Sequence, residues 1–152
     1  MLLGDDGFGP ELVSYLGANV RMPDGVLALD TGMGVTRILF DLALAPRKPH
    51  RLIVADAMRL GEPPGTVSLV PLDSLEIKRV RAFSVHQEPT SCLLKELSEL
   101  SGIEVFLLAA EPERMPQEVS PGLSAAVRGA IPAACDLLQD LVGGDRLEAS
   151  ES

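Results

Sequence analysis

Two apolar runs, RLIVADA at residues 51–57 and IEVFLLAA at residues 103–110, most strongly constrain the fold of this 152-residue chain. Continuous apolar stretches of this length are typical of strands that are covered on both faces, as in a parallel sheet. Apolar residues at helical spacing occupy the segments between and around these runs. The predicted helices span residues 10–18, 36–44, 90–100 and 122–142.

Two shorter segments add further strand candidates. GVLALD at residues 25–30 is a short apolar run that ends in an acid, and TVSLVPL at residues 66–72 alternates as a strand does. Strands therefore alternate with helices, which predicts a single α/β domain: a three-layer α/β/α sandwich with a largely parallel sheet. We expect the domain to cover residues 1–142 and residues 143–152 to form a flexible acidic tail.

Charge and cysteine content exclude several classes of function. The net charge of −9 argues against binding to a nucleic-acid backbone, which needs clustered Lys and Arg. The sequence contains no apolar run of the roughly 20 residues that a membrane span needs, and its first residues do not show the basic-then-apolar pattern of a signal peptide. Cys92 and Cys135 are too few for a thiolate metal site, and we expect two reduced, buried thiols in a cytoplasmic protein.

An acidic, glycine-rich turn, GDDGFG at residues 4–9, precedes the first predicted helix. The fixed φ of Pro10 suits the first helical position. The positive end of the helix dipole favours an ionised carboxylate on Asp5 or Asp6, and an ionised carboxylate is better suited to metal binding than to general acid catalysis. The alternative is that these acids only cap the helix.

Other polar candidates lie where predicted strands end. Asp30 and Asp56 each follow an apolar run directly, where ligands gather in open α/β sheets, although either acid could instead cap the next element. His50 lies in a basic loop, whereas His86 precedes a helix. One acid of the first turn, Asp56 and His86 could together hold a divalent transition metal and leave coordination positions open.

Taken in order, these segments resemble the hydrogenase maturation endopeptidases, which process the large subunit of [NiFe] hydrogenases. The resemblance covers nearly the whole chain. Its motifs are GDDGFG at 4–9, DTGMG at 30–34, RLIVADA at 51–57, PPGT at 63–66, His86-Gln87, and VSPGLSAAV at 119–127. The family pattern also starts with a strand and a Gly-x-Gly-Asn segment ahead of this turn, whereas the given sequence starts inside that segment. Either the start is assigned too late or the chain lacks its first strand, and a missing strand would leave a gap in the sheet and expose apolar surface.

The resemblance implies an endopeptidase that removes the C-terminal extension of a nickel-loaded large-subunit precursor. It assigns both nickel contact and catalysis to Asp6, Asp56 and His86, and the nickel is supplied by the substrate rather than held tightly by the chain. The runner-up function is a processing-incompetent or truncated relative that acts as a binding module for a hydrogenase subunit.

Two further interpretations are less favoured. One is an unrelated α/β hydrolase or nucleotide-binding domain that uses the glycine turns. The GDDGFG turn is a poor phosphate cradle, because Asp5 and Asp6 repel an anion and no P-loop Lys follows. Cys92 lies six residues after His86, but it stands beside Leu93 in a predicted helix. We therefore expect Cys92 to face inward rather than to act as a nucleophile.

Overall fold

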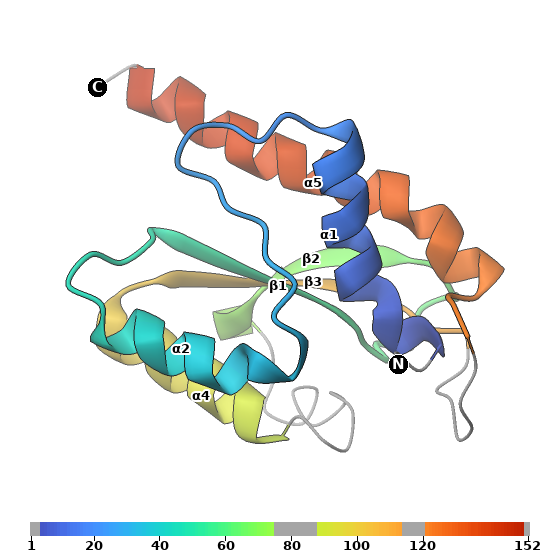
Figure 1. Ribbon diagram of the computed structural model, residues 1–152, viewed down its shortest axis with the longest axis horizontal. Helices are drawn as coiled ribbons and strands as arrows, with labels where there is room; N and C mark the ends of the chain where they lie inside the picture. The colour runs from blue at the N-terminus through green and yellow to red at the C-terminus, as the bar shows by residue number, and fades with distance from the viewer. Residues whose placement is uncertain (1–3, 75–87, 114–120, 151–152) are drawn as a thin grey trace.

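A computed structural model describes residues 4–74, 88–113 and 121–150 (Figure 1). It contains 3-10 helices, α-helices and strands. In chain order these are η1 (Gly4–Gly7), α1 (Phe8–Asn19), η2 (Gly32–Gly34), α2 (Val35–Leu44), β1 (Arg51–Ala57), β2 (Val67–Pro71), η3 (Leu72–Ser74), α4 (Glu88–Ser101), β3 (Glu104–Ala110) and α5 (Ala125–Ser150).

The described strands form a sheet in the order β1-β3-β2. β1 runs parallel to β3, with Arg51 opposite Glu104 and Ala57 opposite Ala110. β2 pairs with the other edge of β3 in the antiparallel direction, so the sheet is mixed rather than largely parallel. The alternation at residues 66–72 predicts the strand but not its direction, and an antiparallel edge strand is common on an otherwise parallel sheet.

Helices cover both faces of the sheet (Figure 1). α1 and α5 pack on one face around Phe8, Leu108 and Val127, which we call the α1/α5 core. α2 and α4 lie on the other face, around Leu94 and Leu107, in the α2/α4 core. Leu107 and Leu108 are neighbours in β3 that enter opposite cores, because successive side chains of a strand point to opposite faces.

The predicted strand at residues 25–30 is wrong. This segment lies in the connection between α1 and α2 and is extended, but no strand of the described residues pairs with it. Its burial alternates: Val26 and Ala28 are half-buried, whereas Leu27 and Leu29 are 77% and 54% exposed. An alternating pattern therefore gives an extended chain with one covered face, but a strand also needs a hydrogen-bonding neighbour.

Two other expectations concern the remaining segments. The short apolar run VRAFSV at residues 80–85, which the sequence alone does not assign to a strand or a loop, lies outside the described residues. The C-terminal helix α5 is longer than predicted, because it continues past residue 142 to Ser150. Pro132 lies inside α5.

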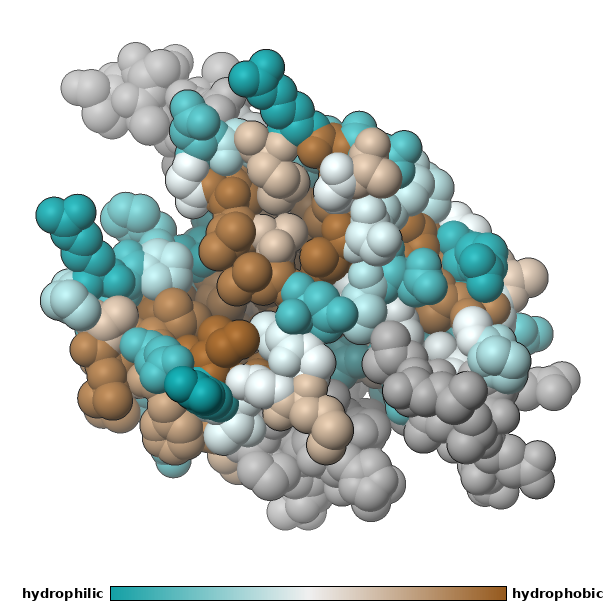
Figure 2. Space-filling view, viewed as in Figure 1, coloured by the Kyte–Doolittle hydropathy of each residue, from teal (hydrophilic) through white to brown (hydrophobic). Residues whose placement is uncertain are grey.

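Large apolar side chains also lie on the surface. Figure 2 shows hydrophobic atoms gathered in the centre of the visible face. Among the described residues, the exposed large hydrophobic side chains are Leu27, Leu29, Met33, Phe40, Leu44 and Leu100. In the described part of the chain, no helix has the length and apolar character needed to cross a bilayer.

Candidate functional site

The two acids of the first turn have different environments. Asp5 is 2% exposed, and its carboxylate accepts backbone N–H groups of Glu113 at 2.9 Å and Ser124 at 2.7 Å. A buried carboxylate needs such donors, so Asp5 fixes η1 to the segments that follow β3 and precede α5. Asp6, the acid assigned to the metal site, is only half-buried.

Gly9 brings the start of α1 directly against β1. A Cβ atom at this position would lie 2.7 Å from the carbonyl oxygen of Ala55, closer than side chains approach backbone oxygens. The absence of a side chain therefore permits this contact, and η1 also touches β1. The turn that carries Asp6 is thus placed beside the carboxyl end of β1, which carries Asp56.

Asp56 is half-buried at the end of β1. Its Oδ1 accepts the backbone N–H of Ala57 at 2.8 Å. This bond holds the carboxylate close to its own main chain at the strand end, where a parallel sheet offers its ligand sites. Asp6 and Asp56 therefore supply carboxylates from two elements that are in contact.

Glu111 is a structural residue that sequence reasoning missed. It is 7% exposed, and its Oε2 accepts the N–H groups of Leu60 at 2.7 Å and Glu62 at 3.3 Å. It therefore fixes the loop that follows Asp56 and the end of β1. The sequence offers one indication of this role, which is the position of Glu111. It directly follows the apolar run of β3, as Asp56 lies at the end of the apolar run of β1.

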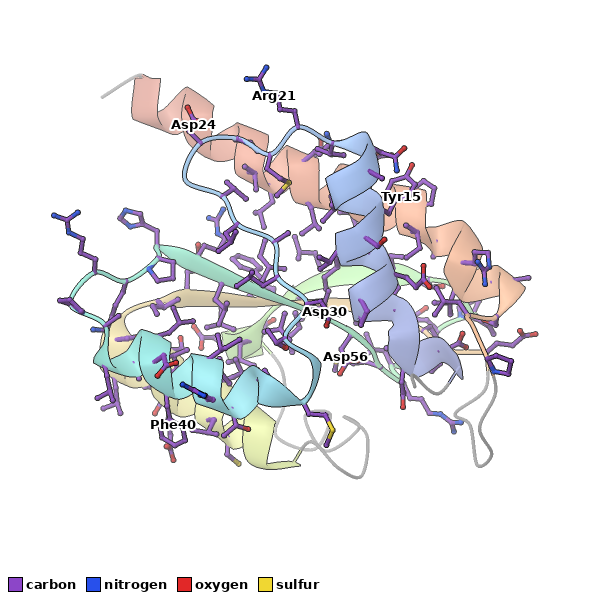
Figure 3. All side chains as sticks on the ribbon, viewed as in Figure 1. Tyr15, Arg21, Asp24, Asp30, Phe40 and Asp56 are labelled. Atoms are coloured by element: carbon purple, nitrogen blue, oxygen red, sulfur yellow. The ribbon has the colours of Figure 1, made fainter. Side chains whose placement is uncertain are left out.

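Asp30 caps the element that follows it, which is the second of the two roles considered for this acid in the sequence. It is exposed, and its Oδ1 accepts the N–H of Gly32 at 3.0 Å, which stabilises the turn into η2 and α2. Figure 3 labels Asp30, in the connection before η2, and Asp56, near the end of β1. His50 is exposed, as expected from its basic loop.

His86 lies outside the described residues, so the predicted trio of Asp6, Asp56 and His86 stays a prediction. Within residues 4–74, 88–113 and 121–150, no group of three or more His, Cys, Asp or Glu side chains could hold a metal ion. The described part of the chain thus supplies only two members of the trio, Asp6 and Asp56. Two carboxylates are hard oxygen donors, and an imidazole is the additional ligand that a nickel-like ion would require.

The cysteines depart from the expectation of two buried thiols. Cys135 is buried, and burial, together with the neighbouring charge of Asp136, raises the pKa of its thiol above the ordinary value. Cys135 therefore remains protonated and unreactive at neutral pH. Cys92 is exposed, not inward-facing, because the phase of α4 turns Leu94 and Leu97 into the core instead.

The sequence profile of the hydrogenase maturation proteases matches residues 10–140. This chain belongs to that family. A Methanocaldococcus jannaschii protein assigned to the hydrogenase maturation proteases is 33% identical over 140 residues, covering 91% of this chain and 88% of the relative. The Coenzyme F420 hydrogenase subunit delta of Methanothermobacter thermautotrophicus is also 33% identical, over 94% of this chain and 89% of the relative.

Solved structures of family members share the fold. The hydrogenase maturating endopeptidase HybD from Escherichia coli superposes with a TM-score of 0.69 at 25% identity, covering 95% of this chain and 87% of that protein. A hydrogenase 2 maturation peptidase from a Thaumarchaeota archaeon gives a TM-score of 0.63 at 32% identity, over 93% of this chain and 91% of that protein. The α/β fold and the family expected from the sequence motifs are thus confirmed.

Proposed function

We propose that this chain is an endopeptidase that removes the C-terminal extension of a nickel-loaded [NiFe] hydrogenase large-subunit precursor. The observation that carries the proposal is the contact between η1 and β1, because it brings the Asp6 turn to the strand end that holds Asp56. Membership of a protease family supports the peptidase activity.

Selectivity for the loaded precursor follows from the number of ligands. Asp6, Asp56 and His86 would contact the nickel that the precursor brings, and the precursor's own ligands would complete the coordination. Three ligands from the chain leave coordination positions open for the precursor's own ligands, so in this proposal the ion arrives with the precursor. Nickel in this proposal is part of the substrate, and only a loaded precursor is held in the position for cleavage.

The chemistry at the cut is hydrolysis of one peptide bond. A cation beside the scissile carbonyl can polarise it toward attack by water, which avoids a covalent nucleophile on the protein. Cys135 does not offer such a nucleophile, because it is buried and its thiol pKa is raised. Neither a membrane nor a nucleic acid enters the reaction, and a cytoplasmic location stays a prediction.

Substitution of the three assigned residues tests the proposal. Asp6→Asn, Asp56→Asn and His86→Ala should each lower the rate of processing of a nickel-loaded precursor by at least about 100-fold, since changing residues merely adjacent to metal ligands already lowers affinity or activity by about 10–100-fold. The rate is measured from the mobility shift of the large subunit on gels. Asp24→Asn is the matched control, because Asp24 is an exposed acid in the connection between α1 and α2.

The outcomes separate the proposal from its alternative. Full processing by all three variants would remove the assigned residues from the reaction. An unmodified chain that binds the loaded precursor and cleaves none of it would instead favour the binding module. Unfolding midpoints of the variants, measured by circular dichroism, show whether a loss of processing is only a loss of the fold.

A further inference from the structure

Arg59 is an exposed cation beside the candidate site. It is the third residue after Asp56, in the loop that joins β1 to β2. An extended chain spans at most about 3.6 Å per residue, so the Cα atoms of Asp56 and Arg59 lie within about 11 Å of each other. Within the part of the chain that the structure describes, the exposed Arg59 side chain takes part in no ion pair or hydrogen bond. Its charge is therefore available to a bound molecule.

The main chain on both sides of Arg59 is held in place. The Met58 N–H donates to the Ala110 carbonyl at 3.0 Å, and the Leu60 N–H donates to the buried Glu111 carboxylate at 2.7 Å. The Met58 side chain is 1% exposed, and Leu60 packs against the α2/α4 core. An anchored backbone reduces the ordering cost when the arginine binds a partner.

The far end of the same loop is fixed as well. The Gly65 N–H donates to the Glu111 carbonyl at 2.8 Å, and the Glu111 N–H donates to the Thr66 carbonyl at 2.9 Å. A Cβ atom at Gly65 would lie 2.6 Å from the carbonyl oxygen of Ala126, so the loop also lies directly against the start of α5. The loop thus presents Arg59 from a fixed position at the carboxyl end of β1.

The charges around Arg59 indicate what it would bind. Asp6 and Asp56 are half-buried acids at this end of the sheet, Glu62 is an exposed acid in the same loop, and the whole chain carries a net charge of −9. These acids attract a cation and repel an anionic peptide. The Arg59 guanidinium repels a metal ion, but its planar fork of N–H donors matches a carboxylate. Arg59 therefore allows a carboxylate to approach an otherwise acidic site.

We propose that Arg59 is a specificity-determining residue that binds a carboxylate of the precursor within about three residues of the scissile bond, since an extended peptide advances about 3.3 Å per residue. This inference rests on the proposed function and states which precursors the site prefers. The carboxylate belongs either to an Asp or Glu side chain or to the end of the C-terminal extension. Both sources form the same pair with a guanidinium.

Substitution of Arg59 tests the enzyme side of this pair. Arg59→Gln should lower kcat/KM for the nickel-loaded precursor by about tenfold, the effect of losing one hydrogen bond to a charged group. The loss should lie mainly in KM, because the pair acts on binding and not on the reacting atoms. Arg59→Lys, which keeps the charge but not the fork, should lose less. An unchanged kcat/KM in Arg59→Gln would overturn the proposal.

Arg21→Gln is the matched control. Arg21 is also exposed, and it lies in the connection between α1 and α2, far from Asp56 in the view of Figure 3. This variant should keep the kcat/KM of the unmodified chain. The unfolding midpoint of Arg59→Gln should also stay unchanged, since the Arg59 side chain forms no ion pair or hydrogen bond among the described residues.

Changes in the precursor test the other side of the pair. Each Asp and Glu near the cut is replaced by Asn or Gln, one at a time, and a separate precursor carries extra glycines at its C-terminus to move the terminal carboxylate. One of these changes should lower kcat/KM by about tenfold with the unmodified chain and have little further effect with Arg59→Gln. Either no effect of any change or an equal loss with both enzymes would overturn the proposal.

A binding measurement separates this inference from the proposed function. An unmodified chain that cleaves no loaded precursor would contradict the proposed peptidase. Calorimetric affinities of the loaded precursor for the unmodified chain and for Arg59→Gln would then decide the role of Arg59. Binding that is about tenfold weaker in the variant would support the carboxylate pair, and equal binding would overturn it.

Discussion

β1 and β3 have the same length and a similar apolar character, yet they occupy different environments. β3 is buried continuously from Leu107 to Ala110, whereas β1 is half-buried along its length until Ala57. β3 lies between two strands, while β1 has one partner among the described residues. Both are covered by helices on their faces, so the difference comes from the edges.

This comparison shows what an apolar run encodes. The apolar side chains of a strand indicate that both of its faces are covered. The position of the strand within the sheet depends instead on its backbone hydrogen-bonding partners, which come from elsewhere in the chain. Of the two strands that lie at the ends of the described sheet, β1 carries the candidate site, since Asp56 lies at its carboxyl end. Among the described residues β1 is half-buried along most of its length, whereas the central strand β3 contributes buried side chains to both cores.

The largest expected difference is in packing. Leu108→Ala should lower the free energy of unfolding by about 3 kcal/mol, because Leu108 is fully buried and a cavity would remain. Leu52→Ala in half-buried β1 should lower it by only about 1 kcal/mol, since part of the side chain is already in water. Urea unfolding measures both values. Equal losses would mean that β1 is covered as completely as β3.

A smaller effect is expected where α1 meets β1. Gly9→Ala should destabilise the fold by about 2 kcal/mol, because its Cβ would lie 2.7 Å from the backbone oxygen of Ala55. Gly17→Ala is the control on the same helix: a Cβ there meets no atom within 4 Å, and alanine should stabilise the helix by about 0.5–1 kcal/mol. Thermal unfolding compares the two. A neutral Gly9→Ala would show that the α1–β1 contact gives way easily.

The smallest effect concerns the ion pair that joins the starts of the two strands. The Arg51 Nε and Nη2 atoms both lie 2.7 Å from Oε2 of Glu104, and the guanidinium is 5.2 Å from the centre of the Phe106 ring. A double-mutant cycle of Arg51→Ala and Glu104→Ala should give a coupling of about 0.5–1 kcal/mol, since the Glu104 side chain is 55% exposed. The coupling should decrease at high salt. A salt-independent value would mean that packing on Phe106 dominates.

The candidate site was predictable only in part. The motifs that resemble the family pointed to Asp6 and Asp56, and the structure brings the elements that carry them into contact. The different role of Asp5 follows from bonds to Glu113 and Ser124, more than a hundred residues away. No local pattern could indicate such partners, and the same holds for Glu111 and the loop after β1.

The sequence by itself determined the periodic elements: the helices, the two long apolar strands, and the acids that follow them. Those features depend on neighbours within a few residues, which share a face of a helix or strand. Only the tertiary structure decided that β2 runs antiparallel, that residues 25–30 form no strand, and that Asp5 is buried while Asp6 is not. Each of these depends on hydrogen-bonding partners that chain folding brings together from distant parts of the sequence.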